Sequence, residues 1–225
     1  MFEVRDVEIN NQQVLESLNK FKDFILKKRD EGVLDKDLDL NAKDHTRDRW
    51  LADDYMHRII DRGRGHEGFP ESMRSYHGLM PNTGGAAQSF RESYEPYRAM
   101  SRQLNMDLMT ELSARNNTLV TVYPPGGWIS WHNNANAAGY NVIFSWSEDG
   151  NGWFDYWDMD KKERVRVPDH SGWQCKMTYF GSYDEPDKLC YHAASTDCLR
   201  ISVAYVWGRN EAMWQDIIED IENPI

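Results

Sequence analysis

The sequence predicts an α+β fold, with helices in the first half of the chain and an antiparallel sandwich or barrel in the second. Helical periodicity dominates up to about residue 117, and short β-type runs separated by turn residues follow it. Helices that precede a block of strands brace one face of an antiparallel sheet. We expect a single domain over residues 1–225, with mainly helical support and a loop segment in 1–117, the barrel core in 118–208 and a C-terminal helix in 209–225.

The first two helices are predicted from apolar residues that recur every three or four positions. Between Gln12 and Asp30 this pattern is continuous, and Gly32 stands where a C-terminal stop is expected. Residues 50–61 repeat the pattern over a shorter length and end before a pair of glycines. We expect both segments to pack an apolar face against the sheet.

Two more helices and a long loop complete the non-strand part of the chain. A helix is expected from Ser93, with Pro96 in its first turn, to the asparagines at 116–117, and a last helix follows Asn210 as its N-cap. Residues 62–88 are rich in glycine and proline. Because loops of this length are uncommon unless they are functional or disordered, this segment is a candidate for covering a substrate, and a plain surface excursion is the alternative.

The second half of the chain contains short runs of high β-propensity. They are Leu119–Tyr123, Tyr140–Trp146, Gly152–Trp157, Arg164–Val167, Gln174–Phe180 and Ile201–Trp207. Repeated short strands of this kind are typical of an antiparallel sandwich or barrel.

Composition and charge limit the partners and the cellular location that we expect for this protein. With 26 Lys+Arg against 37 Asp+Glu the net charge is −11, so we expect no nucleic-acid partner. No apolar run approaches the roughly 20 residues of a membrane-spanning helix, and the N-terminus lacks a signal-peptide pattern, so we expect a cytoplasmic protein without a membrane partner. Cys175, Cys190 and Cys198 lack C-x-x-C spacing and fit reduced thiols.

Two histidines and an arginine could carry chemistry. His132 lies between two predicted strands, where a turn delivers side chains to a barrel mouth, and His192 follows 60 residues later. Arg200 opens the last strand, and Ser202 shares its face by period-2 alternation. An arginine inside a barrel is costly unless it meets a carboxylate, and its planar fork suits a bidentate anion.

This ordered series resembles the Fe(II)/2-oxoglutarate-dependent dioxygenase superfamily, and in particular its prolyl-4-hydroxylase-like branch. The family pattern is His-x-Asp at the end of one strand, a distal histidine, and Arg-x-Ser shortly after it, on a double-stranded β-helix, a jelly-roll barrel of the cupin type. The resemblance covers residues 119–207. Gly152–Tyr156 and Val167–Gly172 also resemble a strand and a turn of the family.

The resemblance implies roles for particular residues. The candidate metal ligands are His132, Asn134 and His192, and the candidate cosubstrate contacts are Arg200, Ser202 and Tyr123. The candidate substrate-pocket residues are Trp131, Tyr140, Trp153, Arg62 and Arg64. The histidines at 45, 57, 66, 77 and 170 have no partner at ligand spacing and are left unassigned. The cupin alternative is disfavoured because a second histidine does not follow His132 at the required spacing.

The chain departs from the family at Asn134, where the pattern has an aspartate ligand. An amide oxygen can bind a metal but contributes no negative charge, so three readings stay open. They are a working oxygenase with a weak ligand, a halogenase, and a non-catalytic binding module with a degenerate metal site. Asp155 could supply a replacement carboxylate, although its simpler role is that of an exposed strand residue.

The first reading implies an enzyme that uses Fe(II) and 2-oxoglutarate, with ascorbate as an accessory reductant. It would decarboxylate 2-oxoglutarate and hydroxylate a peptidyl or small-molecule substrate. Neither the substrate nor the oligomeric state follows from the sequence.

Overall fold

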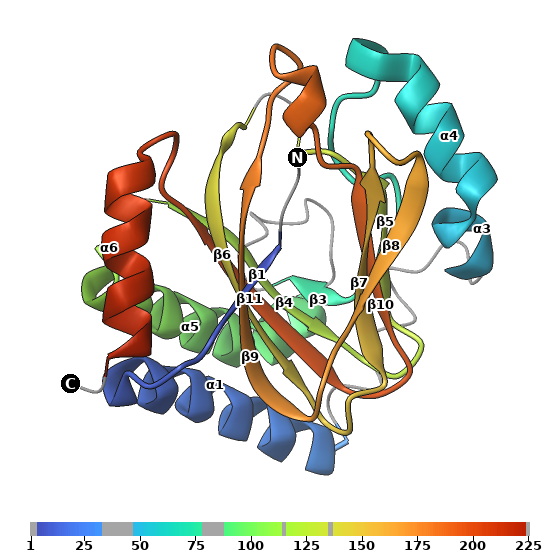
Figure 1. Cartoon of the computed structure of the whole chain (residues 1–225). Coiled ribbons are helices and arrows are strands. Elements are labelled where there is room, and N and C mark those ends of the chain that lie inside the picture. The colour runs from blue at the N-terminus through green and yellow to red at the C-terminus, as the bar shows by residue number, and fades with distance from the viewer. Residues whose placement is uncertain (1–3, 33–46, 78–87, 114–115, 135–136, 224–225) are drawn as a thin grey trace.

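The computed structural model describes residues 4–32, 47–77, 88–113, 116–134 and 137–223, which form two antiparallel sheets and flanking helices (Figure 1). The larger sheet has the order β1-β9-β6-β11-β4-β3 and the smaller has the order β2-β5-β10-β7-β8. The larger sheet contains β1 (Arg5–Val7), β9 (Gly172–Phe180), β6 (Gly139–Ser147), β11 (Arg200–Val206), β4 (Asn116–Tyr123) and β3 (Tyr76–His77). The smaller contains β2 (Met73–Arg74), β5 (Trp128–His132), β10 (His192–Thr196), β7 (Gly152–Asp158) and β8 (Glu163–Pro168).

The chain crosses between the sheets in a regular way. It runs through β4, β6, β9 and β11 in the larger sheet and through β5, β7, β8 and β10 in the smaller one, with every strand pair antiparallel. This order is that of a double-stranded β-helix. The predicted α+β class and its jelly-roll barrel are therefore confirmed.

Helices cover the outer faces of both sheets. α1 (Gln12–Asp30), α5 (Gln88–Glu111) and α6 (Glu211–Glu222) lie on the larger sheet, and α3 (Arg47–Leu51) and α4 (Asp53–Arg62) lie on the smaller one (Figure 1). In α1 the four apolar residues predicted to face the core are all fully buried, Val14, Leu18, Phe21 and Ile25. The main apolar core therefore lies between the larger sheet and its helices, outside the barrel.

The termini of α1 and α6 follow their capping residues. The side chain of Asn11 accepts hydrogen bonds from the backbone N–H groups of Gln13 and Val14, and Asn210 accepts one from Met213. Gly32 has a φ of +67°, the left-handed conformation that ends a helix. The predicted limits of α1 and the predicted N-cap of α6 are confirmed.

Several predicted limits were wrong. α5 begins at Gln88 rather than Ser93, so Pro96 lies inside the helix. Proline is expected in the first turn of a helix, because it lacks a backbone N–H and crowds the preceding turn, but Pro96 lies in the helix interior. The predicted helix over 50–61 is divided into α3 and α4, because Ala52 adopts an extended conformation with a ψ of 148°.

The predicted loop over 62–88 also contains regular structure. It holds a short 3-10 turn, Gly63–Gly65, and the strands β2 and β3, which extend the two sheets. Residues 78–87 of this predicted loop, and His45, lie outside the described residues.

The remaining expectations about composition concern the cysteines and the membrane. Cys175, Cys190 and Cys198 are all buried and free, as predicted. Within the described ranges, we find no helix that is both long enough and apolar enough to cross a bilayer.

Candidate functional site

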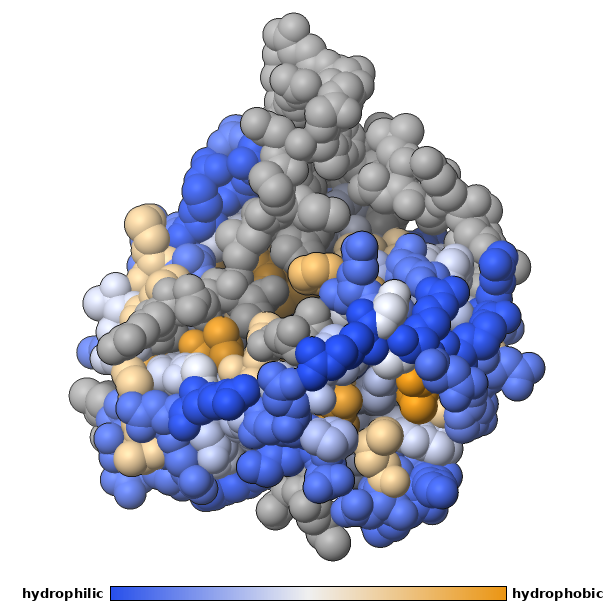
Figure 2. Space-filling model, turned by 90° about the horizontal axis from the view of Figure 1, so that it is seen from above, coloured by the Kyte–Doolittle hydropathy of each residue, from blue (hydrophilic) through white to orange (hydrophobic). Residues whose placement is uncertain are grey.

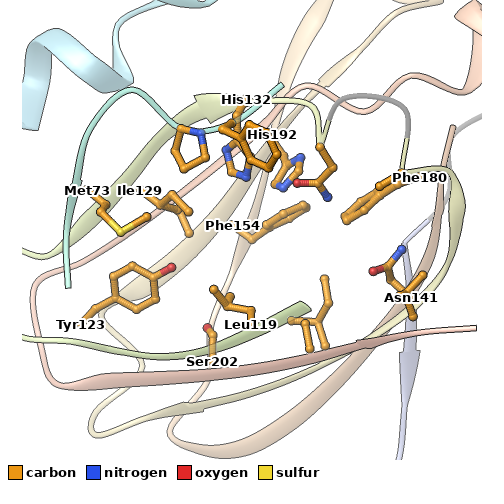
Figure 3. Close-up of a pocket in the computed structure, with 18 of the residues that line it drawn as sticks. Met73, Leu119, Tyr123, Ile129, His132, Asn141, Phe154, Phe180, His192 and Ser202 are labelled. Carbon is orange, nitrogen blue, oxygen red and sulfur yellow. The ribbon is translucent and has the colours of Figure 1, made fainter. Parts of the chain in front are cut away.

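A cavity of about 520 Å³ lies inside the barrel between the two sheets (Figure 3). Most of the residues that line it are apolar or aromatic: Phe69, Pro70, Met73, Leu119, Ile129, Ala137, Ile143, Phe154, Phe180, Ala194, Ala204 and Val206. The polar lining residues are Tyr123, His132, Asn134, Asn141, His192, Arg200 and Ser202. Seen from above, the described surface is mostly hydrophilic, and hydrophobic residues are visible in its central hollow (Figure 2).

His132 and His192 meet at one end of this cavity. His132 is the last residue of β5 and His192 the first of β10, and the two are directly paired across the antiparallel ladder. Their ring centroids are 4.1 Å apart. The side chains lie next to each other in Figure 3, although 60 residues separate them in the sequence.

Both imidazole rings are oriented by backbone carbonyls. Nδ1–H of His132 donates to the carbonyl of Ser130 at 2.8 Å, and Nδ1–H of His192 donates to that of Cys190 at 3.0 Å. This fixes the tautomer, so each Nε2 carries a free lone pair. In metal-binding histidines, the ring nitrogen that does not bind the metal typically donates such a hydrogen bond.

The protonation of the two rings suits the same role. Burial lowers the pKa of His132 well below its usual value, and the neighbouring charge of His192 lowers it further. Burial lowers the pKa of His192 to about 4. Both imidazoles are therefore neutral near pH 7, which is the form that binds a metal.

Two aromatic side chains hold His192 in place. Phe180 stacks on its ring, with centroids 4.8 Å apart and an interplanar angle of 16°, and Phe154 lies at 5.6 Å. Both phenylalanines line the cavity beside the histidines (Figure 3). They restrict the ring and form a wall from which water is excluded.

Asn134 lies two residues beyond His132 and lines the same cavity. Its φ of +61° is in the left-handed region, which asparagine tolerates better than most residues. Its backbone N–H donates to the carbonyl of Gly68 at 2.9 Å, which anchors the turn after β5. The structure thus brings the three candidate metal ligands to one end of the cavity, and their role as ligands stays a prediction.

Arg200 belongs to the other end of the cavity and forms a buried ion pair with Asp169. Its Nε donates to Oδ2 of Asp169 at 2.6 Å, and the two side chains are 4% and 0% exposed. Nη1 donates to the hydroxyl of Ser202 at 2.5 Å and Nη2 to that of Ser145 at 3.2 Å. Nη2 also donates to Oδ1 of Asp169 at 3.5 Å, so the carboxylate spans Nε and Nη2, and the two hydroxyls accept from Nη1 and Nη2.

Tyr123 completes this end. It is paired with Arg200 across β4 and β11, and its ring centroid is 5.7 Å from the guanidinium carbon. Burial raises the pKa of Tyr123 to about 12, so the phenol stays protonated and can donate a hydrogen bond. Burial opposes the charge on Arg200, but Asp169 outweighs this effect and raises the pKa of Arg200, which remains a cation.

The residues at the histidine end fit a divalent metal with nitrogen and oxygen preference. The two free Nε2 atoms and the amide of Asn134, which lines the same cavity, would give a metal a neutral donor set. In the described part of the chain, no group of three or more His, Cys, Asp or Glu side chains is placed to hold a metal, so no carboxylate joins the two histidines and Asn134. A metal here would keep its full double charge.

The predicted substrate-pocket residues do not line this cavity. Trp131 packs under α3 and α4, with its indole N–H donating to the carbonyl of Leu51, and Tyr140 packs against Tyr179 and Trp214 on the outer face of the larger sheet. Trp131 precedes His132 by one residue, and successive side chains of a strand point to opposite faces.

The other three are also outside the cavity. Trp153 contacts Arg166 and Arg47, Arg62 pairs with Glu71, and Arg64 pairs with Asp184. Both ion pairs of the 62–64 stretch are at the exposed surface.

Asp155 was expected to be an exposed strand residue, but it is buried. Both of its carboxylate oxygens accept hydrogen bonds from Arg166, each at 2.8 Å, and the residue does not line the cavity. Asp155 is therefore a structural ion-pair partner and not a replacement ligand.

The sequence did not single out Asp169 or Ser145. Asp169 lies in the turn after β8, and its partner Arg200 is 31 residues away, so no local spacing connects them. Ser145 could have been found from strand pairing, because it lies directly opposite Ser202 in the ladder of β6 and β11.

No protein-family model and no curated protein matches this chain. Solved structures that are similar include a prolyl-4-hydroxylase from Pseudomonas putida, with 14% identity, a TM-score of 0.33, and coverage of 72% of this chain and 89% of that one. A prolyl hydroxylase from Trichoplax adhaerens, in complex with a peptide fragment of the hypoxia inducible factor oxygen degradation domain, has 12% identity and a TM-score of 0.40, with 94% and 84% coverage. The viral collagen prolyl hydroxylase of Paramecium Bursaria Chlorella virus-1 has 13% identity and a TM-score of 0.30, with 70% and 91% coverage.

Proposed function

We propose that this chain is a non-haem iron oxygenase that couples the decarboxylation of 2-oxoglutarate to the hydroxylation of a peptidyl or small-molecule substrate. The observation that carries this proposal is a single cavity with two neutral histidines at one end and a buried arginine with hydroxyl groups at the other. A molecule with an oxo-acid at one end and a carboxylate at the other is complementary to that arrangement.

At the histidine end, His132, His192 and Asn134 would hold Fe(II) through two imidazole nitrogens and an amide oxygen. Bound there, Fe(II) would supply the activation of O₂ against 2-oxoglutarate that C–H hydroxylation requires. The protein's own contribution is to keep both imidazoles neutral and oriented, through burial and through the Nδ1–H contacts to backbone carbonyls.

At the other end, Arg200 and Ser202 would bind the distal carboxylate of 2-oxoglutarate. Each serine hydroxyl that accepts from the guanidinium still has its own hydrogen to donate to an anion. The protonated phenol of Tyr123 adds a further donor. Contacts of this charge-assisted kind position a carboxylate as well as bind it.

The walls between the two ends are apolar. Phe154 lies between the histidines and Ser202 in Figure 3, and Ile143, Met73 and Phe69 also line the cavity. A dry wall keeps water from an oxidising centre and favours a substrate that inserts an apolar group. The substrate itself is not identified by this lining.

Succinate release tests the proposal. The purified chain, supplied with Fe(II), 2-oxoglutarate and air, should form succinate even without a substrate, and His192→Ala should form none. His170→Ala is a matched control, because His170 is an exposed histidine that does not line the cavity. Succinate from His192→Ala at the wild-type rate would refute the proposed ligand set.

A binding module with a degenerate metal site is the second candidate, and the neutral Asn134 favours it. Such a protein would bind 2-oxoglutarate without turning it over. It would be supported if neither the wild type nor Asn134→Asp releases succinate while both still bind 2-oxoglutarate.

A further inference from the structure

Asp169 neutralises Arg200, the one cation among the described residues that line the cavity. Among the described lining residues, Arg200 alone carries a formal charge, because both histidines are neutral. Asp169 does not itself line the cavity. It forms an ion pair with Arg200, and its side chain is 0% exposed. The barrel end therefore holds one positive and one negative charge before any ligand binds.

This ion pair is built into the backbone around it. The N–H of Asp169 donates to the carbonyl of Gly152 at 2.8 Å. A Cβ atom at position 152 would lie 2.4 Å from Oδ2 of Asp169 and 3.2 Å from Cδ of Arg200, so only glycine leaves room for the pair. Asp169 is thus not a surface carboxylate that happens to lie near an arginine.

The pair sets the charge of the loaded cavity. A divalent metal on His132, His192 and Asn134 brings two positive charges with no compensating ligand, and 2-oxoglutarate brings two negative charges. With the neutral pair of Arg200 and Asp169, the sum is zero. An uncompensated charge is expensive in a buried site, so this balance favours one metal dication together with one dianion.

We propose that Asp169 is a positioning residue that supplies, at the arginine end, the negative charge that Asn134 does not supply at the metal end. Its carboxylate accepts from Nε and Nη2 of Arg200, while Nη1 donates to Ser202, which lines the cavity, and its charge makes a cavity that holds one dication and one dianion electrically neutral. This inference rests on the proposed function. It predicts that removing the negative charge at 169 offsets the effect that adding one at 134 has on the binding of the dianion.

Binding measurements on four proteins test this compensation. The four proteins are the wild type, Asn134→Asp, Asp169→Asn and the double variant, and each is loaded with Mn(II) and titrated with 2-oxoglutarate in the absence of oxygen. Asn134→Asp should tighten Mn(II) binding but weaken 2-oxoglutarate binding by about tenfold, the size expected for one added charge at an intermediate effective dielectric. Asp169→Asn alone should tighten 2-oxoglutarate binding, and the double variant, whose total charge equals that of the wild type, should bind within about twofold of the wild type.

Asp155 provides the matched control. It is also buried and paired with an arginine, but it does not line or adjoin the ligand groups of the cavity. Asp155→Asn should not restore the affinity for 2-oxoglutarate that Asn134→Asp loses. The inference is overturned if the double variant of Asn134 and Asp169 binds 2-oxoglutarate as weakly as Asn134→Asp alone, or if Asp155→Asn restores the affinity to the same extent.

A second measurement needs only the Asn134→Asp variant and so does not depend on the folding of Asp169→Asn. It compares 2-oxoglutarate with 2-oxopentanoate, which lacks the distal carboxylate and carries one negative charge. The preference of the wild type for the dianion should fall by about tenfold in Asn134→Asp, and an unchanged preference would overturn the inference. If the wild type binds neither Mn(II) nor 2-oxoglutarate, the proposed function fails as well; if it binds both but Asp169→Asn does not offset Asn134→Asp, only the inference fails.

Discussion

Replacing Arg200 by methionine should destabilise the fold and weaken 2-oxoglutarate binding. Methionine is a long apolar side chain without charge, so the substitution leaves Asp169 buried at 0% exposure without its partner. Loss of one partner of a buried ion pair costs about 3 to 5 kcal/mol. For a chain of this size, that cost lowers the melting temperature by roughly 6 to 20 °C.

The effect on binding is separate from the effect on stability. Truncating one partner of a buried charge contact costs about 2 to 5 kcal/mol of binding free energy. The dissociation constant of 2-oxoglutarate should therefore rise by roughly 30-fold to 5,000-fold. The assay is a calorimetric titration of the Mn(II)-loaded protein without oxygen, at a temperature where the variant is folded.

Arg166→Met is the matched control for this prediction. Arg166 also pairs with a buried aspartate, Asp155, which is 2% exposed, but it lies outside the cavity. This variant should lose stability and keep the wild-type affinity for 2-oxoglutarate. The reasoning is refuted if Arg200→Met binds 2-oxoglutarate as tightly as the wild type, or if Arg166→Met loses as much affinity.

Three further predictions follow from the same geometry. His132→Ala and His192→Ala should each weaken Mn(II) binding by about 100-fold or more, and a loss below threefold in an equilibrium metal titration would show that the histidines are not ligands. Gly152→Ala should destabilise the protein by about 1 to 3 kcal/mol, because its Cβ would lie 2.4 Å from Oδ2 of Asp169, and an unchanged denaturation midpoint would contradict this crowding. Burial lowers the pKa of His66, whose Nδ1 accepts from the N–H of Gly68, so its contribution to stability is complete above pH 6.5 and is lost as the pH falls below that value. His66→Asn should therefore lose less stability than the wild type between pH 7 and pH 5 in urea denaturation, and parallel pH profiles would contradict it.

The fold class was predictable because its signals are local. The three-to-four-residue spacing of apolar residues in α1, the glycine stop after it and the asparagine cap of α6 act within a few residues, and the sequence predicted all three correctly. The strands β5 and β10 were not predicted, because every residue in them is buried and no alternation of polar and apolar residues marks them. The small residues of β10, His-Ala-Ala-Ser-Thr, also have weak β-propensity.

The two ends of the cavity differ in how much of them the sequence could predict. The positions of His132, His192, Arg200 and Ser202 follow from an ordered series along the chain, and the structure places all four around one cavity. Asp169 could not be predicted, since its role depends on a partner 31 residues away and on the absence of a side chain at Gly152. Trp131 and Trp153 each stand one residue before a residue that lines the cavity, and a shift of one residue along a strand reverses the face, so neither lines this cavity.

The central claim is that one cavity holds a metal and 2-oxoglutarate together, and a pair of titrations tests it most directly. 2-Oxoglutarate is titrated without oxygen into the wild-type chain, once with Fe(II) bound and once with the metal removed. The account predicts one 2-oxoglutarate per chain and a dissociation constant at least about tenfold lower when Fe(II) is present, because the oxo-acid end gains a charged ligand contact. No binding under either condition, or equal affinity in both, would contradict it.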